Sequence, residues 1–198
     1  MDISIKSICV FCGSSEGTNP EYRKQAAILG RALAEHAIKI VYGGASIGLM
    51  GALADAANAN KGKVTGVIPE SLEKKEVAHK NLYKLIVTRS MHERKATMAT
   101  LSDAYIVLPG GYGTLEELFE IITWSQLGIH QKPIIIVNLD GYYDKMLSFL
   151  ETVEDSGFIH TNGDESGLFT VVGTIEDCMD KVLSYAIEET ETFKRTMI

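Results

Sequence analysis

The sequence has no apolar run long enough to cross a membrane, although 45% of its 198 residues are hydrophobic. It also lacks long runs of lysine or arginine, and its formal net charge is −7. No basic stripe is therefore available to displace the counterions of a nucleic acid. No proline-, serine- and glycine-rich stretch marks a linker. These absences predict one domain over residues 1–198, with neither a membrane nor a nucleic acid as its partner.

Cysteine is scarce, with three residues in the chain. Cys9 and Cys12 have the Cys-x-x-Cys spacing of redox pairs, but such pairs begin a helix. Here they fall in or at the end of an expected strand, where residues three apart face opposite sides. We therefore expect core cysteines. The N-terminus leads directly into a strand-like segment and lacks the layout of a signal peptide, which predicts a cytoplasmic protein.

Three familiar fingerprints are also missing. No Gly-x-Gly-x-x-Gly follows the first expected strand, which argues against a nicotinamide or flavin site. No Gly-x-x-x-x-Gly-Lys-Ser/Thr sequence indicates a P-loop. His92-Glu93 resembles the start of a zinc-protease motif, but Ala96 stands where the second histidine is required. No cluster of metal ligands is apparent, so the sequence predicts neither a metal nor a cofactor.

What the sequence does contain is an alternation of strand-like and helix-like segments. Asn19-Pro20-Glu21 has the N-cap, first-turn proline and early acid that start a helix. Continuously apolar strands indicate a sheet buried on both faces, and right-handed crossovers then give a three-layer, Rossmann-like, doubly wound parallel α/β fold. The expected strands are 5–11, 38–42, 64–68, 85–88, 104–108, 133–138 and 168–172, and the expected helices are 20–36, 49–60, 91–102, 118–124, 142–156 and 175–189.

The most informative segment is Pro-Gly-Gly-Tyr-Gly-Thr-Leu-Glu-Glu at residues 109–117. It lies between a buried strand and a helix, where a glycine-rich turn lets the backbone N–H groups approach a phosphate. Glycine- and serine-containing loops at 13–15 and 43–46 are expected at the same edge of the sheet. The segment also supplies Glu116 and Glu117, which a phosphate cradle does not need. This combination predicts chemistry on a phosphorylated substrate.

Glu117 has two interpretations. Thr114 and Glu117 have the spacing of a capping box, in which the glutamate binds the N-cap N–H. Alternatively, Glu117 shares a helical stripe with Ile121 and Trp124 and is partly enclosed by apolar side chains. The sequence leaves both interpretations open.

Arg94 falls on the apolar stripe that Met91, Met98 and Leu101 form in the expected helix at 91–102. A guanidinium that faces inward needs an anionic partner, because burying it alone is very costly. That partner is either an acid such as Glu117, in a structural salt bridge, or the phosphate or ribose of a substrate. The next residue, Lys95, lies elsewhere on the helix and by itself predicts a surface position.

Two further residues give weaker signals. Glu76 lies in the irregular, polar stretch between residues 70 and 84, where a solvated side chain is expected. Thr123 lies near the helix face of Glu116 and Glu120, where its hydroxyl is equally typical of ordinary surface.

Several of these segments resemble the Lonely Guy (LOG) family, whose members were long labelled lysine decarboxylases. Residues 109–117 resemble its Pro-Gly-Gly-x-Gly-Thr-x-x-Glu signature, and residues 91–95 resemble its Met-His-x-Arg-Lys segment. Residues 10–15, 122–130 and 140–143 are similar too, so the resemblance spans about residues 5 to 160. The polar segment at 160–167 is least similar to the family.

This resemblance implies hydrolysis of the N-glycosidic bond of nucleoside 5′-monophosphates, cytokinin riboside 5′-monophosphate or AMP, to a free base and ribose 5-phosphate. It implies a homodimer without metal or cofactor, and it makes Arg94 and Glu117 the catalytic pair. The substrate-binding residues that it implies are Glu76, Arg94, Lys95, Gly110, Gly111, Tyr112, Gly113, Thr114, Glu116 and Thr123.

Two other functions stay open. A non-catalytic carrier or sensor would use the same glycine loops to hold a phosphorylated ligand. A pyridoxal phosphate-dependent lysine decarboxylase, which the older label suggests, has less support because no lysine is placed in an obvious aldimine pocket.

Overall fold

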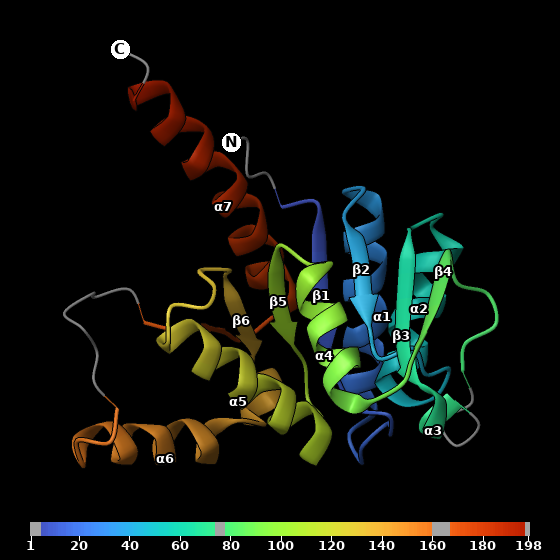
Figure 1. Ribbon diagram of the computed structural model, residues 1–198, viewed down its shortest axis with the longest axis horizontal. Coiled ribbons are helices and arrows are strands. Elements are labelled where there is room, and N and C mark those ends of the chain that lie inside the picture. Colours follow the sequence, from blue (N-terminus) through green and yellow to red (C-terminus); the bar gives the residue numbers. More distant parts are fainter. Residues whose placement is uncertain (1–4, 74–77, 160–166, 197–198) are drawn as a thin grey trace.

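The computed structural model describes residues 5–73, 78–159 and 167–196. Within them, seven strands form one parallel sheet in the order β4-β3-β2-β1-β5-β6-β7 (Figure 1). The doubly wound fold predicted from the alternating pattern is confirmed. The strands are β1 (Ser7–Phe11), β2 (Lys39–Tyr42), β3 (Val64–Pro69), β4 (Lys84–Thr88), β5 (Ala104–Val107), β6 (Ile134–Val137) and β7 (Thr170–Val172).

Helices cover both faces of this sheet. The helices α1 (Pro20–Glu35), α2 (Gly48–Ala59) and α7 (Ile175–Thr196) pack on one face. The opposite face is covered by α4 (Met91–Thr100), α5 (Tyr112–Gln126) and, at its lower margin in Figure 1, α6 (Asp144–Asp155). A short helix, α3 (Glu70–Glu73), follows β3, and a 3₁₀ turn (Leu139–Gly141) precedes α6. The helix α7 extends seven residues beyond the end that the sequence predicts.

The central strands are buried on both faces, as their continuous apolar sequences predict. In β1, Ile8 and Val10 pack toward α1 and α2, whereas Cys9 and Phe11 pack toward α4 and α5. Cys12 returns to the α1 side, so the two cysteines of the Cys-x-x-Cys sequence lie on opposite faces of the sheet. Both are free and buried, and burial, followed by the charge of Glu117, raises their pKa values far above the ordinary range. The prediction of core cysteines is confirmed.

The direction of the strand order reverses at β1 and β5, which lie side by side in the middle of the sheet. Parallel α/β sheets bind ligands at such a switch point, beyond the carboxyl ends of the strands. These ends point downward in Figure 1, where α4 and α5 begin. The loops after β1, β2 and β5 are therefore gathered at one edge of the sheet.

Candidate functional site

Hydrogen bonds join the glycine loops at the carboxyl edge of the sheet. The N–H of Gly13, just after β1, donates to the Pro109 carbonyl at 3.0 Å, just after β5. The Gly13 carbonyl accepts hydrogen bonds from the N–H groups of Leu49 and Met50 at the start of α2. Gly48 has a φ of +62°, and a Cβ there would meet the Ser14 backbone at 2.3 Å, so this approach requires glycine. The predicted meeting of the three loops is confirmed.

The helix α5 begins within the glycine turn, earlier than the sequence predicts. Its N-cap is Gly111, and Thr114 lies inside the first turn. The capping-box interpretation of Thr114 and Glu117 is therefore wrong, because Thr114 is not the residue before the helix. A reciprocal cap of this kind occurs in α4, where Ser90 accepts from the Glu93 N–H and Glu93 accepts from the Arg89 N–H. The start of α5 therefore does not account for the position of Glu117.

Arg94 enters the protein interior from α4 and is 6% exposed. Its Nε donates to the Val67 carbonyl at 3.0 Å, and its Nη2 donates to the Gly43 carbonyl at 3.3 Å. A Cβ on Gly43 would lie 2.3 Å from Nη2, so only a glycine at the end of β2 leaves room for the guanidinium. One carbonyl within β3 and one directly after β2 therefore fix the position of this cation.

Glu117 meets that cation from α5. Its Oε1 lies 3.6 Å from Arg94 Nη1, and the whole residue is 9% exposed. Ile121, one turn further along α5, is buried against the sheet, as the shared stripe predicts. Arg94 and Glu117 thus place one positive and one negative charge side by side, both enclosed by the protein, at the carboxyl edge of the sheet.

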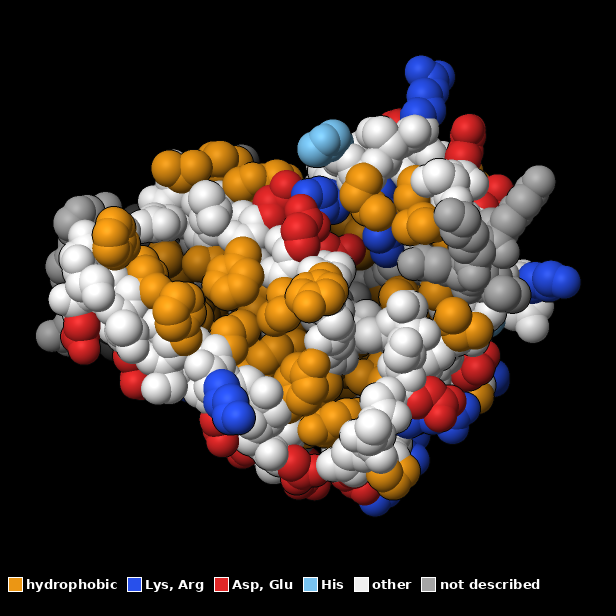
Figure 2. All heavy atoms as spheres, turned by 90° about the horizontal axis from the view of Figure 1, so that it is seen from below, with side chains coloured by type: hydrophobic (Ala, Val, Ile, Leu, Met, Phe, Trp, Pro, Cys, Tyr) orange, Lys and Arg blue, Asp and Glu red, His pale blue; other side chains and the backbone are white. Residues whose placement is uncertain are grey.

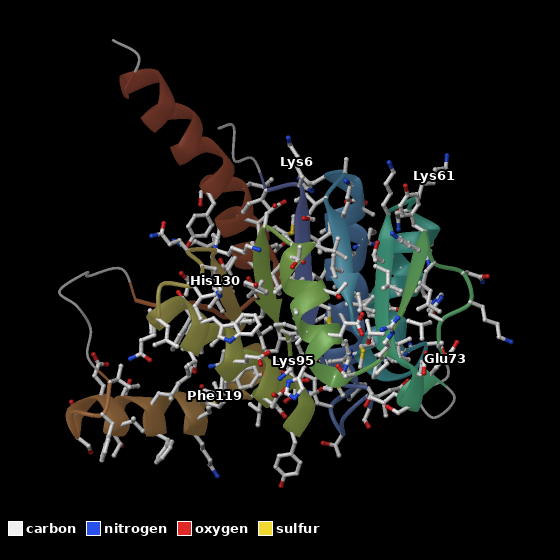
Figure 3. All side chains as sticks on the ribbon, in the orientation of Figure 1. Lys6, Lys61, Glu73, Lys95, Phe119 and His130 are labelled. Atoms are coloured by element: carbon white, nitrogen blue, oxygen red, sulfur yellow. The ribbon has the colours of Figure 1, made fainter. Side chains whose placement is uncertain are left out.

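A second set of charges lies beside the first. The ammonium of Lys95 contacts Glu116 Oε1 at 2.5 Å and Glu120 Oε1 at 2.8 Å, and Lys95 is 8% exposed. Figure 3 shows Lys95 at the junction of α4 and α5. Burial opposes its charge, but the two carboxylates outweigh burial and raise the pKa of Lys95. The surface position that helix periodicity predicted for Lys95 is therefore wrong.

The apolar stripe predicted for α4 is also only partly correct. Met98 is buried, but Met91 and Leu101 are exposed. Met91 is the first residue of the helix and Leu101 is its C-cap, so both lie at its ends, away from its buried middle turn. Arg94 is buried nonetheless, and Met91 Sδ lies 3.4 Å from its Nη1.

The remaining predicted site residues differ in their surroundings. Thr114 is buried against Gly110, whereas a Cβ on Gly111 or Gly113 would meet open space. Tyr112 is almost fully exposed. The Thr123 hydroxyl donates to the Phe119 carbonyl of its own helix at 2.7 Å. Glu76 lies outside the described residues.

Three contacts at this edge involve residues to which the sequence assigned no role. The hydroxyl groups of Tyr142 and Tyr143 donate to the carbonyls of Gly110 and Leu108, respectively. Nothing in the local sequence around these tyrosines indicates such partners. Glu120 is different, because its position four residues after Glu116 places both on one helix face and is a usable signal.

Comparison with known sequences identifies the family. The family model described as "Possible lysine decarboxylase" matches residues 50–182. The cytokinin riboside 5′-monophosphate phosphoribohydrolase LOG7 of Arabidopsis thaliana is 51% identical over 154 residues, which make up 78% of this chain and 71% of that protein. The chain belongs to the LOG family. A second LOG protein of that plant, LOG3, is 45% identical over 181 residues, which cover 91% of this chain and 83% of LOG3.

Solved structures show that the LOG fold is shared more widely. The molybdenum cofactor binding protein from Rippkaea orientalis superposes with a TM-score of 0.66 and 22% identity, covering 90% of this chain and 96% of that one. The Moco carrier protein from Chlamydomonas reinhardtii gives 0.67 and 20%, covering 90% and 98%. At these identities the likeness concerns the α/β fold alone.

Two features are absent from the described part of this LOG chain. It contains no helix long and apolar enough to span a membrane. It also contains no group of three or more His, Cys, Asp or Glu side chains arranged to hold a metal ion.

Proposed function

We propose that this protein hydrolyses the N-glycosidic bond of nucleoside 5′-monophosphates, releasing the free base and ribose 5-phosphate. The proposed substrates are cytokinin riboside 5′-monophosphate, AMP or both. The observation that carries the proposal is the enclosed Arg94–Glu117 pair, which lies at the carboxyl edge of the sheet near the glycine turn. Membership of the LOG family and the names of its relatives add to it.

The chemistry of base release matches this pair of charges. When the base leaves C1′, positive charge develops on the ribose in an oxocarbenium-like transition state. We propose that the Glu117 carboxylate acts on this centre, either by stabilising the cation or by orienting the attacking water. Arg94 holds the carboxylate from one side and offers its guanidinium to the oxygens of the substrate.

The phosphate is proposed to bind at the glycine turn. Gly111 is the N-cap of α5, and the first N–H groups of a helix, together with its dipole, attract anions. A bound phosphate would hold the ribose in place. Its binding energy, gained away from the reacting bond, would then orient C1′ relative to the catalytic groups. The proposed substrate contacts remain Glu76, Arg94, Lys95, Gly110, Gly111, Tyr112, Gly113, Thr114, Glu116 and Thr123.

One assay tests the function. The protein is incubated with AMP, GMP, CMP and N6-prenylated AMP, and the free base is followed by chromatography. We expect adenine or prenylated adenine to appear together with equimolar ribose 5-phosphate. Binding of a nucleotide without release of base would contradict hydrolysis and favour a carrier. Dependence of turnover on added pyridoxal phosphate, with an absorbance band of that cofactor, would contradict the prediction of a cofactor-free enzyme.

We also propose that the protein is a homodimer that associates through an apolar surface on α5 and α6. The helix α6 has no buried residue although one side of it is apolar, and Phe149 on this helix is 64% exposed. Figure 2 shows hydrophobic side chains gathered over a broad area beside the charged ones on this side of the molecule. Exposed apolar patches of this kind mark interaction sites, and a second copy offers the same surface in return. The exposed residues that we assign to it are Phe119, Leu127, Ile129, Phe149 and Phe158.

The cytoplasmic location stays a prediction.

A further inference from the structure

The turn after β5 has three consecutive carbonyl groups, each held by a donor from elsewhere in the chain. The Leu108 carbonyl accepts from the Tyr143 hydroxyl at 2.7 Å, and the Pro109 carbonyl accepts from the Gly13 N–H at 3.0 Å. The Gly110 carbonyl accepts from the Tyr142 hydroxyl at 2.6 Å. The orientation of the three peptide planes between Leu108 and Gly111 is therefore set by contacts from outside the turn.

These contacts also decide where the N–H groups of the turn point. Every peptide bond that the structure describes is trans, and a planar trans peptide directs its N–H opposite to its C=O. Holding the Gly110 carbonyl against Tyr142 thus turns the Gly111 N–H to the other side. Within the described residues, the N–H groups of Gly110 and Gly111 donate no hydrogen bond. They are available donors at the N-terminus of α5.

The two tyrosines differ in what they control. The Leu108 carbonyl belongs to the peptide whose nitrogen is that of Pro109, which carries no hydrogen, so Tyr143 anchors the turn without directing a donor. Tyr142 instead acts on the peptide that carries the Gly111 N–H. We propose that Tyr142 is a positioning residue, whose hydroxyl sets the Gly110–Gly111 peptide so that the Gly111 N–H faces the phosphate of the substrate. The proposal rests on the proposed function, because it takes a sugar phosphate as the ligand.

Aromatic contacts hold the Tyr142 ring independently of its hydroxyl. The ring packs edge-on against Tyr22, with centroids 5.5 Å apart, and against Tyr143, with centroids 4.8 Å apart. Replacement by phenylalanine therefore removes the hydrogen bond to Gly110 and leaves the ring packing in place. Tyr22→Phe is a matched control, because it removes a hydroxyl from the same aromatic group without touching the turn.

Calorimetric titration with ribose 5-phosphate, the product of the proposed reaction, tests this role. We expect Tyr142→Phe to bind it about five-fold more weakly, the size of effect that one lost hydrogen bond produces. Tyr22→Phe should bind it like the wild type, and all three proteins should melt within roughly 4 °C of one another, the largest shift that one lost hydrogen bond produces in a chain of this size. In steady-state assays, Tyr142→Phe should raise KM by a similar factor with little change in kcat, whereas a general loosening of the site would lower kcat as well.

The outcomes separate this inference from the proposed function. Equal ribose 5-phosphate affinity in Tyr142→Phe and wild type overturns the inference, as does an equal loss in Tyr22→Phe or a wild type with no measurable affinity. A wild type that binds ribose 5-phosphate but releases no base contradicts the hydrolysis. In that case, a weaker affinity of Tyr142→Phe still supports the positioning role.

Discussion

The Arg94 guanidinium and the Glu117 carboxylate face each other inside the protein, with Nη1 3.6 Å from Oε1. Arg94 also donates to two backbone carbonyls of the sheet region, that of Val67 within β3 and that of Gly43 directly after β2. It therefore cannot turn away from Glu117 without breaking both of these hydrogen bonds. The distance between the two charges is fixed by the sheet, and this rigidity suits a carboxylate that must act at one point of a bound sugar.

Glu117→Gln keeps the shape of the side chain and removes its charge. We expect the variant to fold, with a melting temperature within a few degrees of the wild type, and to lose base release by roughly 100-fold or more. Chromatography of the free base and thermal unfolding measure the two effects. The control is Glu35→Gln, which changes an exposed glutamate on α1 and should leave turnover unchanged. Turnover by Glu117→Gln at the wild-type rate would contradict the assigned role.

Arg94→Ala should lose both activity and stability. The Val67 and Gly43 carbonyls lose their donors and Glu117 loses its counter-charge, so we expect a loss of about 2 kcal/mol in the free energy of unfolding. Chemical denaturation measures this loss, and the assay for free base measures the activity. Arg31→Ala is the matched control, because Arg31 is exposed and its pair with Glu35 has an N–O distance of 4.0 Å. If Arg94→Ala is as stable as the wild type, the hydrogen bonds from Arg94 to the two carbonyls do not stabilise the protein. If it keeps its turnover, Arg94 is not part of the catalytic pair.

Gly43→Ala tests the space that the guanidinium occupies. The added Cβ would lie 2.3 Å from Arg94 Nη2 and 2.7 Å from Met50 Sδ, so the guanidinium must move. Because small displacements of catalytic groups are costly, we expect base release to fall roughly ten- to hundred-fold. Gly173→Ala is the control, since a Cβ there meets open space. Equal activity in the two variants would show that the fit of Arg94 beneath Gly43 does not matter.

Phe149→Glu tests the proposed contact between two copies. A charge on the apolar surface should dissociate a dimer, because burying the unpaired carboxylate is costly. Size-exclusion chromatography with light scattering should give the mass of a dimer for the wild type and of a monomer for the variant. Tyr83→Glu, at an exposed position directly before β4, the strand at the opposite edge of the sheet from β6 and β7, should stay dimeric. A monomeric wild type, or a dimeric Phe149→Glu, would disprove this surface.

His130 predicts a dependence of stability on pH. The Lys132 N–H donates to its Nδ1 at 3.1 Å, so Nδ1 is an acceptor, and Nε2 is left to donate to the Ile121 carbonyl at 3.0 Å. Burial, opposed by the bond to Ile121 and assisted by the charge of Lys132, lowers the pKa of His130 below 6.5. Protons therefore bind the unfolded chain more readily, so the stabilising contribution of neutral His130 is complete above pH 6.5 and declines as the pH falls below it.

Denaturation of the wild type and of His130→Gln at several pH values measures this effect. The difference between their free energies of unfolding should be largest above pH 6.5 and should shrink toward pH 5, because the variant lacks the titrating group. A difference that is constant over this range, or one that grows as the pH falls, would contradict the assignment of His130 as a half-buried neutral histidine.

Local sequence patterns predicted a helix start correctly where the contacts that cap the helix come from neighbouring residues. Asn19 caps α1 and Pro20 begins it, as predicted, since the Asn19 side chain accepts from the Glu21 N–H only two residues away. Capping failed as an interpretation of Thr114, because the helix after the glycine turn begins three residues earlier than a threonine cap requires, with Gly111 as its N-cap. Glycine can serve as the N-cap of a helix, and the Thr-x-x-Glu pattern of a capping box does not show whether a preceding glycine does so.

Lys95 shows why part of the site was beyond sequence reasoning. Helix periodicity assigns it to the surface, but α5 crosses beside α4 and brings Glu116 and Glu120 against its ammonium. The Tyr142 hydroxyl likewise donates to the Gly110 carbonyl, which lies 32 residues earlier in the sequence. Periodicity describes one helix at a time, and these contacts depend on how two distant segments pack.

The sequence by itself determined the alternation of buried strands and helices, the parallel sheet that follows from it, and the glycine turn at the start of α5. These follow from chain-local preferences and from the hydrophobicity of each segment. The tertiary structure alone decided that Arg94 meets Glu117, that Lys95 is buried between two carboxylates, and that three outside donors orient the turn after β5. Each of these depends on the distance between atoms from separate segments, which is set only when the sheet is assembled and its helices are packed on it.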